Sequence, residues 1–270
     1  MKFADRYGPW AVVAGASEGV GSAFAAEVAR RGCNVLLLAR RQAVLDEVAD
    51  GIRAESGVEV RAVAVDLAEP DAATRVIGAT AGIDVGLLLY TAGADANYQP
   101  FLANPVETAL GMVLRNCVVP VELCHHYAAT MVARQRGGII VVSSGAAFAG
   151  APNMVVYGAS KAFDMVFAEA LWTELHEHGV DVLSLVLGET DTPALRRLRA
   201  KRGQVDDPDA PLPGVTTVEE VVADAIERLP HGPSWMVGEQ LRTGATLLTG
   251  GMTRNELVAV MVELSQEAME

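Results

Sequence analysis

The sequence predicts an α/β fold: a doubly wound parallel sheet of seven strands with helices on both faces, in a single domain. Short apolar runs rich in Val, Leu and Ile alternate with longer segments of helical period, as in a parallel sheet that is covered on both sides. The chain of 270 residues, 51% of them hydrophobic, is long enough for one large domain of this kind. Ligands of such a sheet bind beyond the carboxyl ends of its strands.

Seven apolar runs are expected to form the strands. They cover residues 10–14, 35–39, 58–66, 85–90, 138–143, 180–187 and 235–238. Helices are expected between them, among them 21–31 and 42–55, and the longest helical candidates are 106–135 and 153–178. The proline-rich and acidic segment 202–215 is expected to be a mobile loop.

The formal net charge of −13 argues against a protein that binds nucleic acid or anionic membranes, because phosphate groups and acidic lipids repel such a surface. The N-terminal stretch MKFADRYGPW lacks the apolar core of a signal peptide. No apolar run approaches the ~18 to 20 residues that span a bilayer. The sequence therefore predicts a soluble, cytoplasmic protein without a membrane span.

Cysteine and histidine spacing predicts no metal site. Cys33, Cys117 and Cys124 are odd in number and lie in apolar contexts, which favours reduced thiols in the core. His125 and His126 are adjacent, so they point in different directions on a helix, and the chain offers them no CxxC or HExxH partner. We interpret both histidines as structural.

A glycine-rich turn, AGASEGVG, occupies positions 14–21, directly after the first expected strand. Glycines at this point let the backbone approach a pyrophosphate closely and aim the amides of the next helix at it. Alone, the pattern also suits an ordinary turn between a strand and a helix. The predicted dinucleotide contacts in this turn are Gly15, Ser17, Glu18, Gly19, Val20 and Gly21.

The second expected strand, NVLLLARR, ends in Arg40 and Arg41, where many NAD sites carry a carboxylate for the ribose hydroxyls. Arginine instead pairs with a 2′-phosphate through charge-assisted hydrogen bonds, which favours NADP over NAD, although a solvated charge at Arg40 is the plainer interpretation. We expect Glu18 to pair with Arg40 or Arg41 and to orient it. Asp66 and Leu67, at the end of the third strand, are expected at the adenine edge.

The strongest chemical pattern is VSSGAAFAGAPNMVVYGASKAFD, residues 142–164. Tyr157 and Lys161 are one helical turn apart, so both side chains project from the same face. A phenol with a pKa of ~10 is a poor acid or base at neutral pH, but a neighbouring ammonium favours its ionised form. Ser144 ends the preceding strand, where its hydroxyl could bind a substrate oxygen. The combination of these residues with the glycine-rich turn indicates a catalytic site.

At this point the chain resembles the short-chain dehydrogenase/reductase family over residues 7–193. The motifs that carry the resemblance are, in order, GASEGVG, VDL, LRNCVVP, SSGAA and YGASK. The resemblance implies one Rossmann-like domain over residues 1–270 and an oxidoreductase that interconverts a secondary alcohol and a ketone by hydride transfer with NADP(H) or NAD(H). It also implies a homodimer or homotetramer built through the two long middle helices.

The family pattern makes Tyr157 the general acid/base. Lys161 would lower the pKa of that tyrosine and bind the nicotinamide ribose, and Ser144 would polarise the substrate carbonyl. Asn116, in LRNCVVP, would hold a water that relays protons to Lys161. The further cofactor contacts that the resemblance implies are Gly93, Tyr157, Lys161, Gly188, Thr190 and Thr192.

The chain departs from the family pattern at three places. YTAG, residues 90–93, stands where the family has NNAG, so the asparagine amide that ties the strands together is absent. LGETDTP, residues 187–193, replaces the usual proline-glycine pair, and Glu189 adds an acid beside the nicotinamide region. Glu18 occupies a position that is basic in many NADP-using relatives, although some relatives that reduce ketones on acyl chains or steroids carry an acid there.

The substrate pocket is expected between residues 94–98, residues 145–154 and the segment after Gly188. Its expected lining is apolar and suits a bulky hydrophobic alcohol or ketone, or else only packs the domain. The lining residues are Ala146, Ala147, Phe148, Met154, Leu195 and Leu198.

Two segments are left open by the sequence. Within 189–215, the stretch DTPALRRLRAKRG is either a lid that closes on substrate or a solvated helix with a buried leucine stripe. An amphipathic helix is expected at about 253–269, packed against a neighbouring subunit or over the pocket. The alternative to an enzyme is a dinucleotide-binding sensor or scaffold without turnover, which the acid-base residues disfavour.

Overall fold

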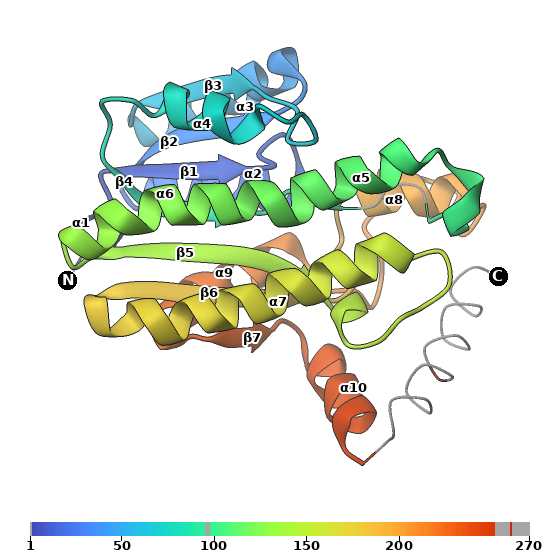
Figure 1. Cartoon of the computed structure of the whole chain (residues 1–270). Helices are drawn as coiled ribbons and strands as arrows, with labels where there is room; N and C mark the ends of the chain where they lie inside the picture. The colour runs from blue at the N-terminus through green and yellow to red at the C-terminus, as the bar shows by residue number, and fades with distance from the viewer. Residues whose placement is uncertain (1, 95–97, 252–259, 261–270) are drawn as a thin grey trace.

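Seven parallel strands form one sheet in the order β3-β2-β1-β4-β5-β6-β7 (Figure 1). The computed structural model describes residues 2–94, 98–251 and 260, without the side chains of 247–249. The strands are β1 (Trp10–Ala14), β2 (Asn34–Ala39), β3 (Val60–Ala64), β4 (Val85–Tyr90), β5 (Gly137–Ser144), β6 (Val180–Leu187) and β7 (Ser234–Met236). The predicted seven-stranded, Rossmann-like sheet is confirmed.

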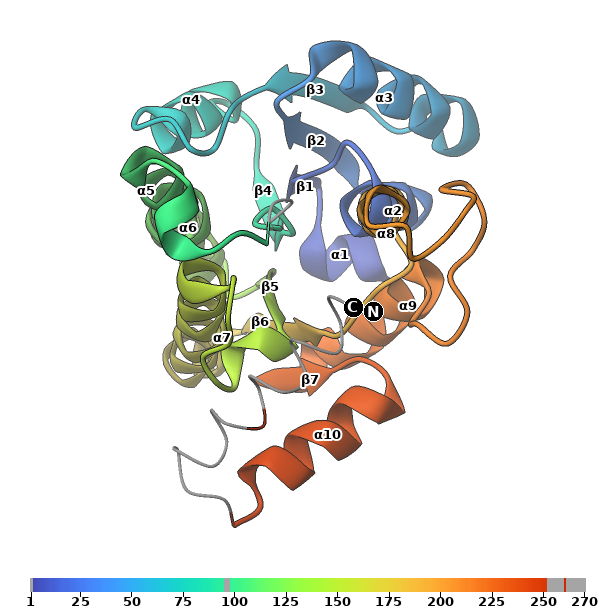
Figure 2. The same cartoon turned by 90° about the vertical axis from the view of Figure 1, so that its right-hand side faces the viewer.

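Helices cover both faces of this sheet, as Figure 2 shows end-on. One face carries α2 (Gly19–Arg30), α3 (Gln42–Ser56) and α9 (Val218–Arg228), and the other carries α4 (Ala72–Ala79), α6 (Val119–Ala133) and α7 (Val155–Leu175). Successive strand residues face opposite layers: Val13 and Leu37 belong to the first core, and Val12 and Leu36 to the second. This double burial explains why the strands are apolar throughout instead of alternating.

The remaining helical elements lie at the ends and edges of the sheet. They are α1 (Phe3–Tyr7), α5 (Val106–Val113), α8 (Pro193–Lys201), α10 (Glu239–Thr249), the π-helical segment η2 (Leu114–Val118) and the short turns η1 (Phe101–Ala103), η3 (Gly145–Ala147), η4 (His176–His178) and η5 (Leu229–His231). The predicted C-terminal helix at about 253–269 lies outside the described residues, Val260 excepted.

The order of the strands creates a switch point between β1 and β4. From β1 the chain moves outward through β2 to β3, returns to β4 on the other side of β1, and continues outward to β7. Connections that leave β1 and β4 in opposite directions open a crevice at the carboxyl edge of the sheet. The glycine-rich turn after β1 and the YTAG segment after β4 both lie at this crevice.

Several predicted boundaries were wrong, and left-handed backbone explains two of them. β3 is shorter than the predicted 58–66, because its pairing with β2 runs only from Val60 to Ala64. Gln135 has a φ of 55°, and the helix predicted over 106–135 ends at Ala133. Asn153 has a φ of 61°, and the helix predicted from 153 begins at Val155. The turn at 114–118 also divides the first of these long helices.

Asp181, at the amino end of β6, anchors α1 at the edge of the sheet that lies away from the crevice. Its carboxylate accepts hydrogen bonds from Arg6 Nη2 at 2.7 Å and from the Tyr7 hydroxyl at 2.6 Å. Asp181 is 7% exposed and Tyr7 is 3% exposed. Both oxygens of this buried carboxylate therefore have hydrogen-bond partners.

Within the described part of the chain, no helix is long and apolar enough to cross a membrane, and no three potential metal ligands cluster together. Cys33, Cys117 and Cys124 are free thiols. Burial raises the pKa of Cys33 to about 11 and that of Cys124 to about 12. His125 and His126 are exposed on α6.

Candidate active site

The glycine-rich turn joins β1 to α2 and packs against the end of β4. Gly15 has a φ of 92°, and a Cβ there would lie 2.8 Å from the backbone nitrogen of Ala92. A Cβ on Gly21 would lie 2.1 Å from the carbonyl oxygen of Gly15. Side chains cannot fit at either position, so backbone meets backbone at the switch point.

The N-terminus of α2 is open to an anion. Glu18 occupies the N-cap position, but its side chain makes no capping hydrogen bond. The first amides of a helix have no partner within the helix, and here no cap satisfies them. Ser17, Gly19 and Val20 are half-buried around them. Amides at a helix N-terminus suit a pyrophosphate, so the turn fits a dinucleotide.

The ends of β2 and β3 place four predicted cofactor residues at the crevice edge. Arg40 and Arg41 follow β2 and are exposed, and no carboxylate stands beside them in sequence. The Asp66 carboxylate accepts a hydrogen bond from the backbone N–H of Ala68 at 3.0 Å. Leu67 is 4% exposed and belongs to the hydrophobic core.

The segment after β6 crosses over the glycine-rich turn. Gly188 is exposed, and the buried Thr190 hydroxyl donates to its carbonyl at 3.3 Å. The Thr192 hydroxyl caps α8 by accepting from the Leu195 amide at 3.2 Å. A Cβ on Gly19 would lie 3.1 Å from the Thr192 methyl group, so the predicted threonine lies directly against the turn.

The predicted pairing of Glu18 with Arg40 or Arg41 was wrong. Both oxygens of Glu18 accept hydrogen bonds from Arg197 of α8, at 2.7 and 2.8 Å. Glu189 is paired through one oxygen with Arg199 of α8. Helix α8 places Arg197 against the glycine-rich turn. Arg197 and Glu18 are 179 residues apart, so sequence proximity does not indicate this contact.

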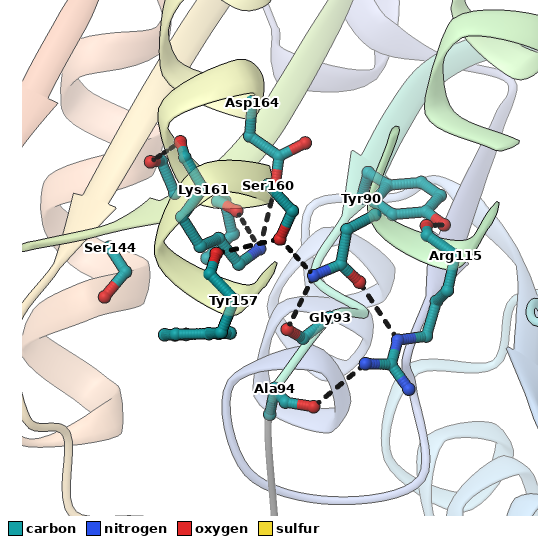
Figure 3. A network of polar contacts seen from close by, with 12 residues as sticks. Tyr90, Gly93, Ala94, Arg115, Ser144, Tyr157, Ser160, Lys161 and Asp164 are labelled. Carbon is teal, nitrogen blue, oxygen red and sulfur yellow. Dashed lines mark hydrogen bonds and ion pairs between the residues drawn. The ribbon is translucent and has the colours of Figure 1, made fainter. Parts of the chain in front are cut away.

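Ser144, Tyr157 and Lys161 come together as predicted, from the end of β5 and one face of α7 (Figure 3). The Ser144 hydroxyl oxygen accepts from the Ala146 amide at 3.2 Å, which leaves its own proton available. The Tyr157 ring lies in the first turn of α7, with its centroid 6.3 Å from that of Tyr98.

Lys161 lies deep in this site. Its ammonium donates to the Val142 carbonyl at 2.8 Å and to Asp164 Oδ2 at 2.9 Å. The two charged side chains are 4% and 1% exposed. Burial raises the pKa of Asp164 to about 6, and the Lys161 ammonium opposes part of that rise. Gly93 has a φ of 129°, which L side chains rarely adopt, and a Cβ there would lie 2.9 Å from both Lys161 Nζ and Asn116 Oδ1, so glycine is strongly favoured.

Asn116 lies in the π-helical segment η2 and is fully buried. Its amide donates to the Ser160 hydroxyl at 2.8 Å and to the Gly93 carbonyl at 3.2 Å, while its oxygen accepts from Arg115 Nε at 3.0 Å. The Ser160 hydroxyl in turn donates to the Tyr157 carbonyl at 2.8 Å (Figure 3). Asn116 is thereby connected to both the end of β4 and the helix that carries Tyr157.

Pro120 explains the π-helical segment. The Val119 amide bonds to the Leu114 carbonyl five residues earlier, and Pro120 has no N–H to offer. The Arg115 carbonyl therefore loses the helix donors four and five residues on. The Tyr90 hydroxyl donates to this carbonyl instead. Burial raises the pKa of Tyr90 well above its usual range, so the phenol stays protonated as a donor.

A small cavity lies beside Tyr157, between the 99–105 segment, α5 and the start of α7. Its apolar side chains include Phe101, Met112 and Val156. Of the predicted walls, residues 145–154 contribute Asn153, and 95–97 lie outside the described residues. The six predicted lining residues are not among its walls, and Ala147 is buried in the domain at 6% exposure.

A model of the short chain dehydrogenase family matches residues 9–203. The chain belongs to this family. The short-chain dehydrogenase described here is thus an oxidoreductase that acts on CH–OH and C=O groups with NAD(P) as acceptor.

Two relatives of similar length are named 7beta-hydroxysteroid dehydrogenase. The one from Clostridium sardiniense is 35% identical over 261 residues, 96% of each chain. The one from Collinsella aerofaciens is 33% identical over 261 residues, 97% of this chain and 98% of the relative.

Solved structures agree with these sequence relationships. A structure from work on the stereoselectivity of a 7beta-hydroxysteroid dehydrogenase has a TM-score of 0.87 and 33% identity, covering 97% of this chain and 99% of the other. A short-chain dehydrogenase from Sphingobium yanoikuyae in complex with NADPH has a TM-score of 0.77 and 29% identity, covering 90% and 92%.

Sequence reasoning missed four polar residues of this short-chain dehydrogenase site: Tyr90, Arg115, Ser160 and Asp164. Asp164 offered a sequence indication, since it is an acid three residues after Lys161 in an otherwise apolar part of a helix. For Tyr90, the sequence indicates only that an asparagine of the family pattern is replaced. The role of Tyr90 depends on the Arg115 carbonyl, 25 residues away along the chain, which Pro120 leaves without a donor.

We predict that Tyr90→Phe lowers both stability and turnover. The variant leaves a buried carbonyl without a donor, which costs about 1 to 3 kcal/mol of the free energy of unfolding, and the altered turn displaces Asn116, which lowers kcat roughly tenfold. Denaturant unfolding and steady-state kinetics measure the two effects.

Tyr127→Phe is the matched control, because its buried hydroxyl hydrogen-bonds to Thr80 at 3.0 Å, away from the crevice. We expect it to lose stability and keep its kcat. Equal kcat values for the two variants would contradict a role of Tyr90 in the site.

Proposed function

We propose that this short-chain dehydrogenase uses NADP(H) to interconvert a secondary alcohol and a ketone on a hydrophobic substrate, with Tyr157 as the general acid/base. The observation that supports this most strongly is the convergence of Ser144, Tyr157 and Lys161 with Asn116, which Ser160 links to the Tyr157 carbonyl, at the switch point of the sheet. A dinucleotide-binding scaffold without turnover needs the glycine-rich turn but none of these side chains.

Side chains of the protein carry out the proton transfer. In ketone reduction, Tyr157 donates its hydroxyl proton to the carbonyl oxygen of the substrate, and the available Ser144 proton forms a hydrogen bond to the same oxygen. In alcohol oxidation, Tyr157 accepts the hydroxyl proton. When bound, the nicotinamide supplies or accepts the hydride. Asn116 would hold the water that returns protons through Lys161.

The residues that would hold the cofactor line the crevice from end to end. The amides of the 15–21 turn suit the pyrophosphate, Gly93 leaves space beside Lys161, and Thr192 closes the turn from above. Gly188 and Thr190 follow the same edge, and Asp66 and Leu67 mark the adenine side.

Charge at the adenosine end favours NADP over NAD. Arg40 and Arg41 are exposed after β2, where an NAD site would benefit from a carboxylate. Arg197 pairs with both oxygens of Glu18, which offsets the negative charge nearest to the turn. A 2′-phosphate would therefore meet two arginines and a neutralised acid. The related Sphingobium enzyme was solved with NADPH.

The substrate proposed is a bulky, hydrophobic alcohol or ketone of the hydroxysteroid class. Two relatives that span nearly the whole chain are 7beta-hydroxysteroid dehydrogenases. Phe101, Met112 and Val156 give the cavity beside Tyr157 an apolar wall. Segment 189–215, which carries α8 over the turn, would act as the lid.

A homodimer or homotetramer is part of the proposal. Apolar side chains stand exposed along α5 to α6 and along α7, which lie side by side in Figures 1 and 2. They are Val106, Leu110, Val113, Val118, Val121, Val155, Phe163 and Val166. A contiguous apolar surface of this kind is typical of protein interfaces.

A cytoplasmic location is also proposed. Three free thiols, two of them buried, suit a reducing compartment. Cell fractionation tests this, and recovery of the protein from an oxidising compartment would contradict it.

We expect Tyr157→Phe to lower kcat for a hydroxysteroid, or for another alcohol found by substrate screening, by about 10² to 10⁴-fold, because the proton donor is lost. NADPH binding, measured by fluorescence titration, should be unchanged. Tyr98→Phe is the control, since it removes the hydroxyl group of the neighbouring ring and should retain most of the activity. Cofactor binding without turnover on any alcohol or ketone would instead indicate a sensor.

Arg40→Ala should weaken NADPH binding roughly tenfold or more, because a charge-assisted bond to the 2′-phosphate is lost, and should leave NADH binding nearly unchanged. Titration of one variant preparation with both cofactors makes NADH the internal control. Equal losses for the two would contradict the assignment of Arg40 to the 2′-phosphate and favour NAD.

Val166→Glu should dissociate the oligomer, since it places a charge on a side chain that is 59% exposed in the apolar surface of α7. Molar mass from light scattering measures the effect. Ala43→Glu, an exposed position on α3, should leave the mass unchanged. A monomeric wild-type protein would contradict the proposed assembly.

A further inference from the structure

The Lys161 ammonium is paired with a carboxylate that lies outside the motifs named above. Asp164 follows it by one turn of α7, and Asp164 Oδ2 accepts from Lys161 Nζ at 2.9 Å. Tyr157 precedes Lys161 by one turn, so the phenol, the ammonium and the carboxylate follow one another along one face of the helix (Figure 3). The carboxylate is 1% exposed and is not screened by water.

Asp164 is unusual among buried carboxylates because one of its oxygens is unsatisfied. Oδ1 is buried without a hydrogen-bond partner in the described part of the chain. The titratable groups that face it are Tyr90 of β4, Cys117 of η2 and Cys124 of α6, and the charge of Asp164 raises the pKa of all three, less than burial does. The Tyr90 hydroxyl is committed to the Arg115 carbonyl.

Lys161 is thus the one cation in direct contact with Asp164 among the described residues, since the Arg115 guanidinium bonds to Asn116 and to the Ala94 carbonyl. Folding does not by itself call for an ion pair here, because apolar residues at both positions would avoid the desolvation of two charges. Burial raises the pKa of Asp164 to about 6, so the carboxylate is ionised at neutral pH and becomes neutral in mild acid.

We propose that Asp164 is a positioning residue that holds the Lys161 ammonium at the Val142 carbonyl and offsets part of the positive charge that Lys161 presents to Tyr157. This inference rests on the proposed roles of Tyr157 and Lys161. An ammonium alone favours the phenolate, and a nearby carboxylate opposes it. Asp164 therefore lowers the positive potential that Lys161 creates at the Tyr157 oxygen, which suits the proton donor needed for ketone reduction.

The test compares pH profiles of kcat/KM in both directions. Asp164→Asn keeps an acceptor for Lys161 Nζ and removes the negative charge. Oxidation needs the phenolate, so the rising limb of its profile should move to lower pH, by about half a unit to one unit. Reduction needs the phenol, so the falling limb of its profile should move to lower pH by the same amount.

Asp181→Asn is the matched control, because it makes the same change at a buried carboxylate on the opposite edge of the sheet. Its midpoints should equal those of the wild type. Asp164→Ser is a second neutral variant, and Asp164→Glu, which restores the charge, should restore the wild-type midpoints. A lower kcat with unmoved midpoints in folded Asp164→Asn and Asp164→Ser would overturn the inference.

Failure of both neutral variants to fold would overturn it as well, since Asp164 would then be required for the fold. The inference and the proposed function fail in different ways. Full activity in Tyr157→Phe would refute the proposed chemistry. An inactive Tyr157→Phe together with unmoved midpoints in Asp164→Asn would refute only the role of Asp164.

Discussion

Backbone contact without intervening side chains at the switch point is the constraint on which the site depends. Gly15 lies against the end of β4, and Gly21 lies against the carbonyl of Gly15. At the next position of the crevice, Gly93 leaves room for Lys161 and Asn116. Because these approaches leave no room for side chains, the strands, the turn and the helix face are held in one arrangement, which positions the side chains proposed for catalysis.

Polar residues beside this crevice supply hydrogen bonds that the helix and the family asparagine do not. Pro120 leaves the Arg115 carbonyl without a helix donor, and Tyr90 supplies one from β4. Tyr90 thereby ties β4 to the helix, and the Thr91 hydroxyl donates to the Ala14 carbonyl at 2.6 Å, so the tie between the strands is kept with different chemistry. The Asn116 amide donates to the Ser160 hydroxyl and to the Gly93 carbonyl. The departure from the family pattern at residues 90–93 is thus compensated inside the same site.

Much of the fold could be predicted because it follows from local rules. Doubly buried strands are apolar throughout, and the helix spacing of Tyr157 and Lys161 fixes their shared face. Boundaries failed where a non-glycine residue took a left-handed conformation, as at Gln135 and Asn153, which composition does not mark. The partner of Glu18 could not be predicted, since it depends on how elements distant in sequence are arranged. Asp164 lies three residues from Lys161, but its burial depends on how distant elements pack around it.

Arginines of α8 attach this helix to neighbouring segments over the crevice mainly through ion pairs. Arg197 reaches Glu18, Arg199 reaches Glu189, and Arg196 reaches Asp191 and the Asp209 carbonyl. No residue of α8 is fully buried, so little apolar packing reinforces these pairs. Salt shortens the range of such interactions from about 10 Å at 0.1 M to about 3 Å at 1 M. Higher ionic strength is therefore expected to weaken the ion pairs of α8 more than the apolar packing of the sheet.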